Sequence, residues 1–350
     1  MNDAHFCKYL SGKFDDFLGT NDTSDTSDSN LWETFKVVMR GHIISYEASL
    51  KKSRNSRLVE INNKLSQLET QYKLNNNSQT LQEIINFKYE YNSILTKQVS
   101  DQLSRLRTRY FELGDKPHTL LARQLRGQQN SRAILRIRSS VGDILTHPKL
   151  INKRFVEFYQ ELYKSKAKGD VDSWLKNVPI PKLDEASWEA LDATVTIDEV
   201  TDSIRSFASG KAPGPDGFGP EFYKKFSRQV SPPLLRMLSH SIETEKLPPT
   251  LYNADIALIL KPDRDDTNPA SYRLISMLNM DFKIFTKILA NPLNHCIESL
   301  IHSDQTGFIP NRYSFFNTRQ LINIMYHKYT TGSKQAILCL DAEKAFDQVE

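Results

Sequence analysis

Residues 254–278 read ADIALILKPDRDDTNPASYRLISML, and this stretch decides how the rest of the chain is interpreted. Apolar and polar residues alternate over 254–262, and a second run of the same kind covers 271–278, which predicts two β-strands. The residues between them, DRDDTNPAS, are rich in Asp, Asn and Pro and predict a loop. We therefore expect a β-hairpin with a long tip.

On the C-terminal side, the pattern predicts a helix from about Asp281, followed by a short apolar run. The apolar residues of this helix recur at helical spacing and define one face: Phe282, Phe285, Leu289, Leu293, Ile297 and Leu300. Pro292 falls inside it, and a proline in a helix interior predicts a bend or a split. Residues 335–341 read QAILCLD, which predicts a short buried strand that ends in Asp341.

On the N-terminal side, a capping box marks one helix clearly. Thr196 is followed three residues later by Glu199, and Gly210 is a natural helix stop, so a helix is expected near 197–209. The pair Ser231-Pro232 predicts the start of a further helix, because proline is tolerated in a first helical turn. The prolines at 248 and 249 would end it.

Further upstream, a heptad pattern predicts two paired helices. Apolar residues recur at alternating spacings of three and four in a first seam: Leu58, Ile61, Leu65, Leu68 and Tyr72. The polar residues 75–78 break the pattern, and a second seam follows in which Lys88 replaces an apolar residue: Leu81, Ile84, Tyr91 and Leu95. These patterns predict a coiled hairpin, preceded by an acidic disordered loop at 21–30. The expected fold class is α+β, mostly helical.

Composition excludes several classes of protein. The chain has 350 residues and a formal net charge of +4, and this length predicts two domains or slightly more. No stretch approaches the ~20 apolar residues of a membrane span, and the first residues do not resemble a secretory signal. Three widely spaced cysteines argue against a disulfide framework and against a zinc site. We therefore expect a protein of the cytoplasm and nucleus.

Positive charge is concentrated in residues 104–138, which hold nine Lys and Arg against Glu112 and Asp115. Tyr110 and Phe111 lie among them, and arginine forks with aromatic rings suit phosphates and bases. This pattern predicts a nucleic-acid surface, with a merely solvated helical face as the alternative. The expected contacts are Arg105, Arg107, Arg109, Lys116, Arg123 and Arg126.

Asp341 is the first candidate for catalysis. A carboxylate at the end of an apolar strand is where polymerases hold magnesium ions, and two-metal chemistry needs several oxygen ligands. Taken alone, this single residue is equally consistent with a structural or capping role.

Four segments in this order resemble the reverse transcriptases of LINE-type non-LTR retrotransposons. They are KAPGPDGFGPEFYKKF (211–226), the hairpin with its following helix (254–291), LIHSDQTGFIPNR (300–312) and LCLDAEKAFDQ (339–348). Segments 29–46, 107–126 and 142–163 resemble the region that joins endonuclease to reverse transcriptase in such proteins. The resemblance implies a helical linker region over 1–130, an N-terminal extension over 131–240, and the fingers and truncated palm of a right-hand polymerase over 241–350.

The resemblance also implies the reaction and its residues. It implies RNA-directed DNA synthesis with Mg²⁺, an RNA template, a DNA primer and deoxynucleoside triphosphates. Asp341 would be the metal-binding catalytic aspartate, and Phe346 would exclude a ribose 2′-hydroxyl, although a core phenylalanine is the alternative. Lys211 would contact RNA. The remaining nucleotide-binding residues would be Lys261, Arg273, Gln305, Arg312, Ala342 and Glu343.

The chain departs from the family pattern in one respect that affects activity. The paired aspartates expected downstream of Asp341 do not occur in the 350 residues. Two classes of function therefore stay open beside a polymerase that is inactive as this chain: a non-catalytic remnant that binds RNA, and a coiled-hairpin interaction protein that involves no nucleic acid.

Overall fold

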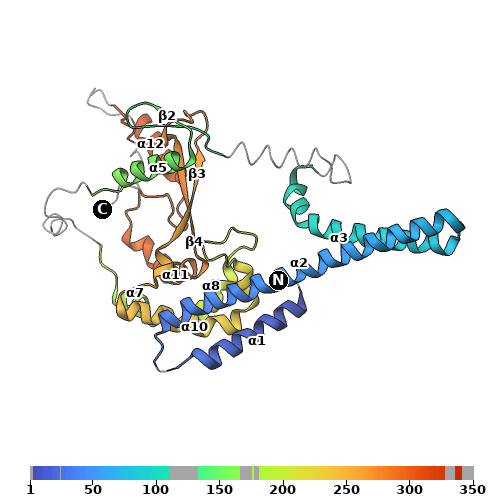
Figure 1. Ribbon diagram of the computed structural model, residues 1–350. Helices are drawn as coiled ribbons and strands as arrows, with labels where there is room; N and C mark the ends of the chain where they lie inside the picture. The colour runs from blue at the N-terminus through green and yellow to red at the C-terminus, as the bar shows by residue number, and fades with distance from the viewer. Residues whose placement is uncertain are drawn as a thin grey trace. The chain divides into compact units, whose positions relative to one another are not determined.

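The structure is a computed structural model that describes residues 3–23, 25–110, 133–165, 176, 181–327 and 336–340. This part of the chain is mostly helical and contains two small antiparallel sheets (Figure 1), which confirms the expected fold class. The chain divides into two compact units, one of residues 2–21 and 34–133 and one of residues 22–33 and 134–350. None of the described helices has a stretch long and apolar enough to cross a membrane.

The first unit begins with α1 (Ala4–Asn21), which packs on α2 (Asp28–Asn75). Phe14 stacks on Phe35 with ring centroids 5.1 Å apart, and both side chains are fully buried together with Leu10 and Met39. Aromatic pairs of this kind add to the free energy gained by burial. The loop expected at 21–30 is shorter than predicted, because α1 continues to Asn21 and α2 begins at Asp28.

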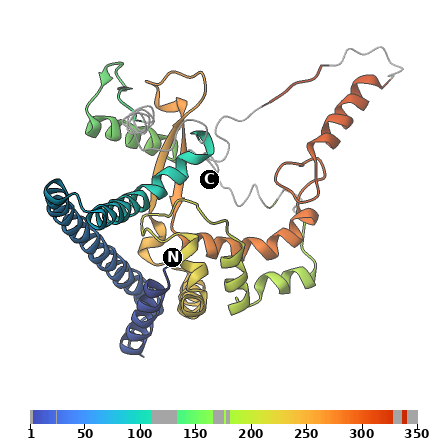
Figure 2. The same ribbon diagram turned by 90° about the vertical axis from the view of Figure 1, so that its right-hand side faces the viewer.

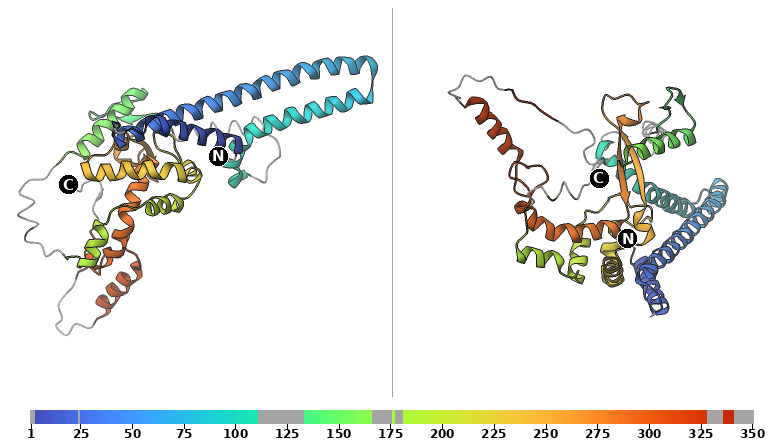
Figure 3. Two further views of the ribbon diagram at one scale, coloured as in Figure 1. Left: turned by 90° about the horizontal axis from the view of Figure 1, so that it is seen from below. Right: turned by 90° about the vertical axis from the view of Figure 1, so that its left-hand side faces the viewer.

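The remainder of α2 lies alongside α3 (Ser78–Tyr110), as the left view of Figure 3 shows. Ile61 and Ile84 are buried where the two helices meet. Arg57 donates to both carboxylate oxygens of Glu90 at 2.7 and 2.8 Å. Lys88, predicted to lie in the seam, is half exposed and pairs with Glu69 at 2.8 Å, because a lysine ammonium keeps its solvation at the edge of a helix pair.

The second unit contains the predicted β-hairpin. Strands β3 (Ala254–Leu260) and β4 (Tyr272–Leu278) pair antiparallel, with Ile259 opposite Arg273 and Leu260 opposite Tyr272. The loop between them contains a 3-10 turn, η2 (Pro269–Ser271), whose entry is capped by the side chain of Asn268. Both strands and the long tip are therefore confirmed.

One face of the hairpin is covered near its tip by α5 (Pro148–Leu162) and by a short hairpin of β1 (Ile137–Arg138) and β2 (Ile144–Leu145) (Figure 2). Tyr272 of β4 contacts Phe155 of α5, with ring centroids 5.3 Å apart and the rings nearly perpendicular. Ile137 and Ile151 complete this small buried cluster. Because side chains alternate along a strand, the residues between these ones on β3 and β4 point to the opposite face and take no part in this cluster.

A helical core lies next to the hairpin. It consists of α7 (Glu185–Asp192), α8 (Ile197–Ser206), α9 (Pro220–Lys225), α10 (Ser227–Thr244) and α11 (Met280–Leu300). The capping box of α8 is confirmed, since the Thr196 hydroxyl accepts from the Glu199 backbone amide and the Glu199 carboxylate accepts from the Thr196 amide. A short 3-10 helix, η1 (Pro249–Tyr252), leads into β3.

The predicted helix start at Ser231-Pro232 is wrong, because α10 begins at Ser227 and carries both Pro232 and Pro233 inside it. Each proline removes one backbone donor from the helix, which is costly in isolation. The helix persists because its inner face is fully buried, with Val230, Leu234 and Met237 at 0% exposure. The free energy gained by burying this face outweighs the tendency of the two prolines to break the helix.

Two expectations for α11 need correction. The helix runs without interruption from Met280 to Leu300, so the split expected at Pro292 is wrong, whereas the alternative, a bend, stays a prediction. Its buried residues include Ile284 and Ile288, whereas Leu289 and Leu293 of the predicted apolar face are 48% and 40% exposed. The inward face is set by packing against α7 and α8, which a pattern within α11 alone does not reveal.

The buried strand predicted at 335–341 is also wrong for the residues described. Residues 336–340 have no regular secondary structure, and Leu338 and Leu340 are 79% and 86% exposed. A strand needs a neighbour that accepts its backbone hydrogen bonds, and the described part of the chain pairs no strand with this segment. The preceding helix, α12 (Ser314–Tyr326), likewise has no buried residue.

Candidate nucleic-acid and nucleotide interface

Two of the predicted nucleotide-binding residues lie on one face of the β3–β4 hairpin. Arg273 is paired with Ile259, and the Lys261 amide donates to the Ser271 carbonyl at 2.9 Å, which extends the ladder by one step. Since residues two apart share a face of a strand, Lys261 and Arg273 point to the same side. This is the face opposite Tyr272 and α5. Arg273 is exposed, and Lys261 Nζ donates to the Ala270 carbonyl at 3.4 Å.

The loop between these strands is held by two ion pairs, one to Arg138 of β1 and one to Arg136 just before it. Arg136 donates to Asp266 at 3.1 Å, and Arg138 donates to Asp265 at 3.3 Å. The Arg138 amide also donates to the Thr267 carbonyl at 2.7 Å. The Thr267 amide, which donates to the Asp265 carboxylate, lowers the pKa of Asp265 and keeps it ionised. Two of the nine basic residues of 104–138 therefore support this loop, and sequence analysis missed this role.

Lys211 begins a tight loop that we call the Pro-Gly loop, residues 211–219 (KAPGPDGFG). The loop closes through a bond from the Gly217 amide to the Gly214 carbonyl at 3.0 Å, and Gly217 has a φ of +82°. Such a φ is readily available to glycine and strained for other residues. At its base, the Glu221 carboxylate accepts from the Gly210 amide. The Lys211 side chain is exposed.

A cavity of about 220 Å³ lies between the Pro-Gly loop and the start of α11. Apolar groups such as Phe207, Phe218 and Leu278 line it, and Lys211 and Lys283 are the charged residues among its walls. Lys287, one turn further along α11, lies over the Phe207 ring at 5.0 Å from its centroid. The surroundings of this cavity are thus positively charged, which suits a phosphate group.

Arg312 and Gln305 lie together in the segment after α11. The Arg312 guanidinium donates to four backbone carbonyls, those of Glu298, Ile301, His302 and Gln305, at 2.6–3.0 Å. These carbonyls belong to the end of α11 and the turn that follows it, where helix carbonyls lack helical partners. Gln305 is exposed and donates to the Gly307 carbonyl at 3.3 Å. The structure thus gives Arg312 a structural contact, and its nucleotide contact stays a prediction.

The Arg312→Ala variant is expected to lose about 1–3 kcal/mol of stability, because the carbonyls at the end of α11 lose their donor. Thermal unfolding followed by far-UV circular dichroism measures this loss. Arg312→Lys should recover only part of it, since an ammonium cannot reach four carbonyls in the geometry of a guanidinium. A melting temperature of Arg312→Ala equal to that of the unchanged chain would contradict this role.

Other predicted site residues lie where the structure gives no side-chain geometry. Arg105, Arg107 and Arg109 belong to the last turns of α3. The others lie outside the described residues: Lys116, Arg123, Arg126, Asp341, Ala342, Glu343 and Phe346. Among the residues that the structure does describe, no three His, Cys, Asp or Glu side chains gather in a way that would hold a metal ion.

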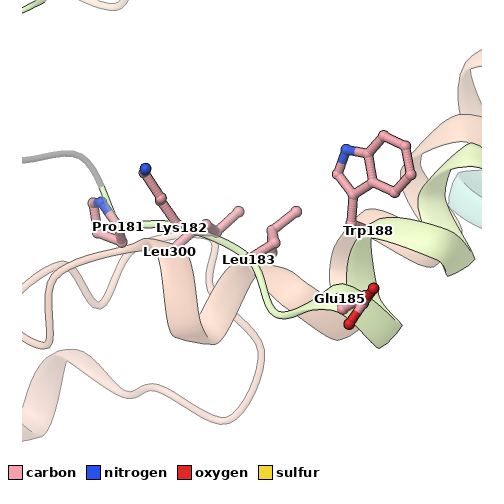
Figure 4. Close-up of a pocket in the computed structure, with 6 residues that line it drawn as sticks. All are labelled: Pro181, Lys182, Leu183, Glu185, Trp188 and Leu300. Carbon is pink, nitrogen blue, oxygen red and sulfur yellow. The ribbon is translucent and has the colours of Figure 1, made fainter.

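A second cavity, of about 580 Å³, lies between residues 181–188 and the end of α11 (Figure 4). Trp188 stands at its edge and is 60% exposed. Its other lining residues are Pro181, Lys182, Leu183, Glu185 and Leu300. One lysine and one glutamate give this cavity no net charge, so it does not add to the basic surface.

Comparison with known proteins bears on what this surface does. Residues 259–350 match the family model of the reverse transcriptases (RNA-dependent DNA polymerases). The chain is 26% identical over 322 residues to the "Transposon TX1 uncharacterized 149 kDa protein" of Xenopus laevis, which covers 91% of the chain and 24% of that relative. It is 23% identical over 157 residues to the "Probable RNA-directed DNA polymerase from transposon BS" of Drosophila melanogaster, which covers 44% and 17%.

A third relative, the "Probable RNA-directed DNA polymerase from transposon X-element" of Drosophila melanogaster, is 26% identical over 153 residues, or 43% of the chain and 17% of the relative. The chain therefore spans about a quarter or less of the length of these relatives. The resemblance inferred from the sequence motifs is confirmed.

Proposed function

Because the chain is related to the reverse transcriptases of LINE-type non-LTR retrotransposons, we propose that it forms the fingers and the first palm segment of an RNA-directed DNA polymerase. One observation carries this proposal. The family match begins within β3, so it takes in Lys261, Arg273 and Asp341 in a single segment. Residues 1–130 would form the helical linker region, and residues 131–240 would form the N-terminal extension of the reverse transcriptase.

The open face of the β3–β4 hairpin would bind the incoming deoxynucleoside triphosphate. Lys261 and Arg273 share that face, and two cations side by side can stabilise the charge that accumulates on phosphate oxygens during transfer. Gln305 and Arg312 would lie near template and nucleotide. Ala342 and Glu343 would provide backbone close to the phosphates, and Phe346 would exclude the ribose 2′-hydroxyl.

Asp341 would be a ligand of the metal ions. Reverse transcriptases use divalent cations, and we propose Mg²⁺ for this protein. When bound, the metal pair activates the primer hydroxyl and neutralises charge on the triphosphate. The contribution of this chain would be a carboxylate oxygen, the ligand type that Mg²⁺ prefers.

The RNA template and the primer would be held through charge. Phosphates would be contacted, without reading of bases, by Lys211 of the Pro-Gly loop and by Arg105, Arg107, Arg109, Lys116, Arg123 and Arg126. The paired helices α2 and α3 would form the coiled hairpin, which precedes most of these basic residues in the sequence.

Primer extension on poly-rA/oligo-dT tests the proposed activity. In a polypeptide that adds the downstream segment with the paired aspartates, Asp341→Ala is expected to reduce incorporation to background. Lys261→Gln and Arg273→Gln are each expected to raise KM for the deoxynucleotide about tenfold or more, because each removes a charge-assisted bond to phosphate. The 350-residue chain by itself should incorporate nothing, since two-metal chemistry needs more than one carboxylate.

Arg264→Gln is the matched control. Arg264 is exposed in the loop between β3 and β4 and carries the same charge a few residues from Lys261. Its removal should leave KM nearly unchanged. Incorporation that persists in Asp341→Ala would reject the proposed catalytic role, and RNA binding without any incorporation by the extended polypeptide would favour a non-catalytic RNA-binding protein.

A further inference from the structure

The middle of the Pro-Gly loop is hydrogen-bonded to a buried side chain of the second unit, that of Asn279. This residue links the end of β4 to the start of α11 and is 1% exposed. Its Oδ1 accepts from the Asp216 amide of the loop at 3.1 Å, and its Nδ2 donates to the Thr250 carbonyl of η1 at 3.0 Å. The amide thus joins three segments that lie far apart in the sequence.

Backbone packing at the same place is very close. A Cβ atom added at Gly214 would lie 2.5 Å from the backbone nitrogen and from Oδ1 of Asn279, and 2.6 Å from the carbonyl carbon of Leu278. Backbone atoms cannot yield to such a contact, so only glycine permits the loop to approach Asn279 this closely. The hydrogen bond and the glycine together hold the middle of the loop against Asn279.

The main chain of Asn279 has a separate task. Its carbonyl accepts from the Lys283 amide at 3.2 Å, which belongs to the first turn of α11. Lys283 is therefore positioned by the helix, whereas Lys211 is positioned by the loop that the Asn279 side chain holds. Both lysines line the 220 Å³ cavity.

We infer that Asn279 is a positioning residue for RNA: its side-chain amide holds the Pro-Gly loop so that Lys211 joins Lys283 at one phosphate-binding site. The ligand class is the phosphate backbone of a single RNA strand. This inference rests on the proposed function, because it assumes that the chain binds RNA. Asn279 itself makes no contact with RNA in this scheme.

This inference predicts how the effects of single and combined substitutions on RNA binding are related. Removing Lys211 eliminates one phosphate contact and should make the slope of log K against log salt less negative by about 0.7 for a single strand. Removing the Asn279 side chain should cause the same change, because Lys211 no longer reaches its phosphate. The two changes should not add. The effect of removing the Lys283 side chain should add fully to the effect of removing the Asn279 side chain, because α11 positions Lys283.

The experiment titrates the full chain with a labelled oligouridine at several salt concentrations. The variants are Lys211→Gln, Lys283→Gln, Asn279→Ala, and Asn279→Ala combined with each lysine change. Gly214→Ala disturbs the same contact from the loop side and should match Asn279→Ala. Gly41→Ala is its control, since a Cβ there would meet nothing within 4 Å. Circular dichroism at the titration temperature shows that each variant is folded.

The outcomes separate two kinds of failure. If the unchanged chain does not bind oligouridine at low salt, the proposed function and this inference fail together. If it binds but Asn279→Ala and Gly214→Ala leave the slope unchanged, or if the effects of Asn279→Ala and Lys211→Gln add, the positioning role is rejected while RNA binding stands. A loss of stability alone would lower the melting temperature without reproducing the slope change of Lys211→Gln.

Discussion

The Trp32→Ala variant is expected to lose about 3–5 kcal/mol of unfolding free energy, the range for truncating a large buried aromatic side chain. Trp32 lies in the first turns of α2 and is 1% exposed. Its Nε1 donates to Oδ2 of Asp281 at 2.9 Å, and Asp281 is completely buried at the start of α11. The variant therefore creates a cavity and also removes a donor from a buried carboxylate.

Urea unfolding followed by far-UV circular dichroism measures this loss. Two further variants show how much of it comes from the hydrogen bond and how much from burial. Trp32→Phe keeps most of the packing and removes the N–H donor, so it should cost about 1–3 kcal/mol. Trp188→Ala removes an equally large side chain that is 60% exposed, and its effect should stay within ~0.5 kcal/mol. An effect of Trp32→Ala no greater than that of Trp188→Ala would show that this contact does not stabilise the unit.

The second large effect concerns RNA affinity. If about five residues of 104–138 contact phosphates of a single strand, log K should fall against log salt with a slope near −3.5, or 0.7 for each contact. Replacing Arg105, Arg107, Arg109 and Arg123 by Gln should flatten this slope and weaken binding to all RNA sequences similarly. Fluorescence titration of the full chain with labelled RNA at several salt concentrations measures both quantities.

The structure supplies the matched control. Arg136 and Arg138 already pair with Asp266 and Asp265, so replacing both by Gln removes charge from the same segment with much less effect on the slope. Tyr110→Ala should weaken binding without changing the slope, because stacking releases no counterions. A slope that the four arginine replacements leave unchanged would identify the run as a solvated face and would favour the interaction-protein alternative.

The elements that were predicted correctly are those whose signals are local. The alternating pattern of β3 and β4, the Asp- and Pro-rich loop between them and the Thr196–Glu199 capping box each lie within a few residues. The predictions were wrong where contacts with residues far away in the sequence determine the bounds or the buried face of a helix. Burial of Val230 and Leu234 lets α10 pass through two prolines, and contacts with α7 and α8 bury a face of α11 that includes Ile284 and Ile288.

The same distinction applies to the site. Lys261 and Arg273 were predicted from motifs, and their common face follows from the strand register. The role of Asn279 was missed, because an asparagine between a strand and a helix predicts only a helix cap. Its contacts to Asp216 and Thr250 arise from segments 63 and 29 residues away. Sequence patterns of short range carry no information about such contacts.

The bond between Trp32 and Asp281 joins residues 249 positions apart, and Arg136 reaches Asp266 across 130 positions. Contacts of this separation raise the contact order of the second unit, and a higher contact order slows folding. During synthesis, the start of α2 leaves the ribosome long before α11 exists to cover its tryptophan. We therefore expect the segment that matches the polymerase family not to fold by itself: a protein begun at residue 259 would lack most of β3, the whole of α5 and the tryptophan that donates to Asp281 of α11.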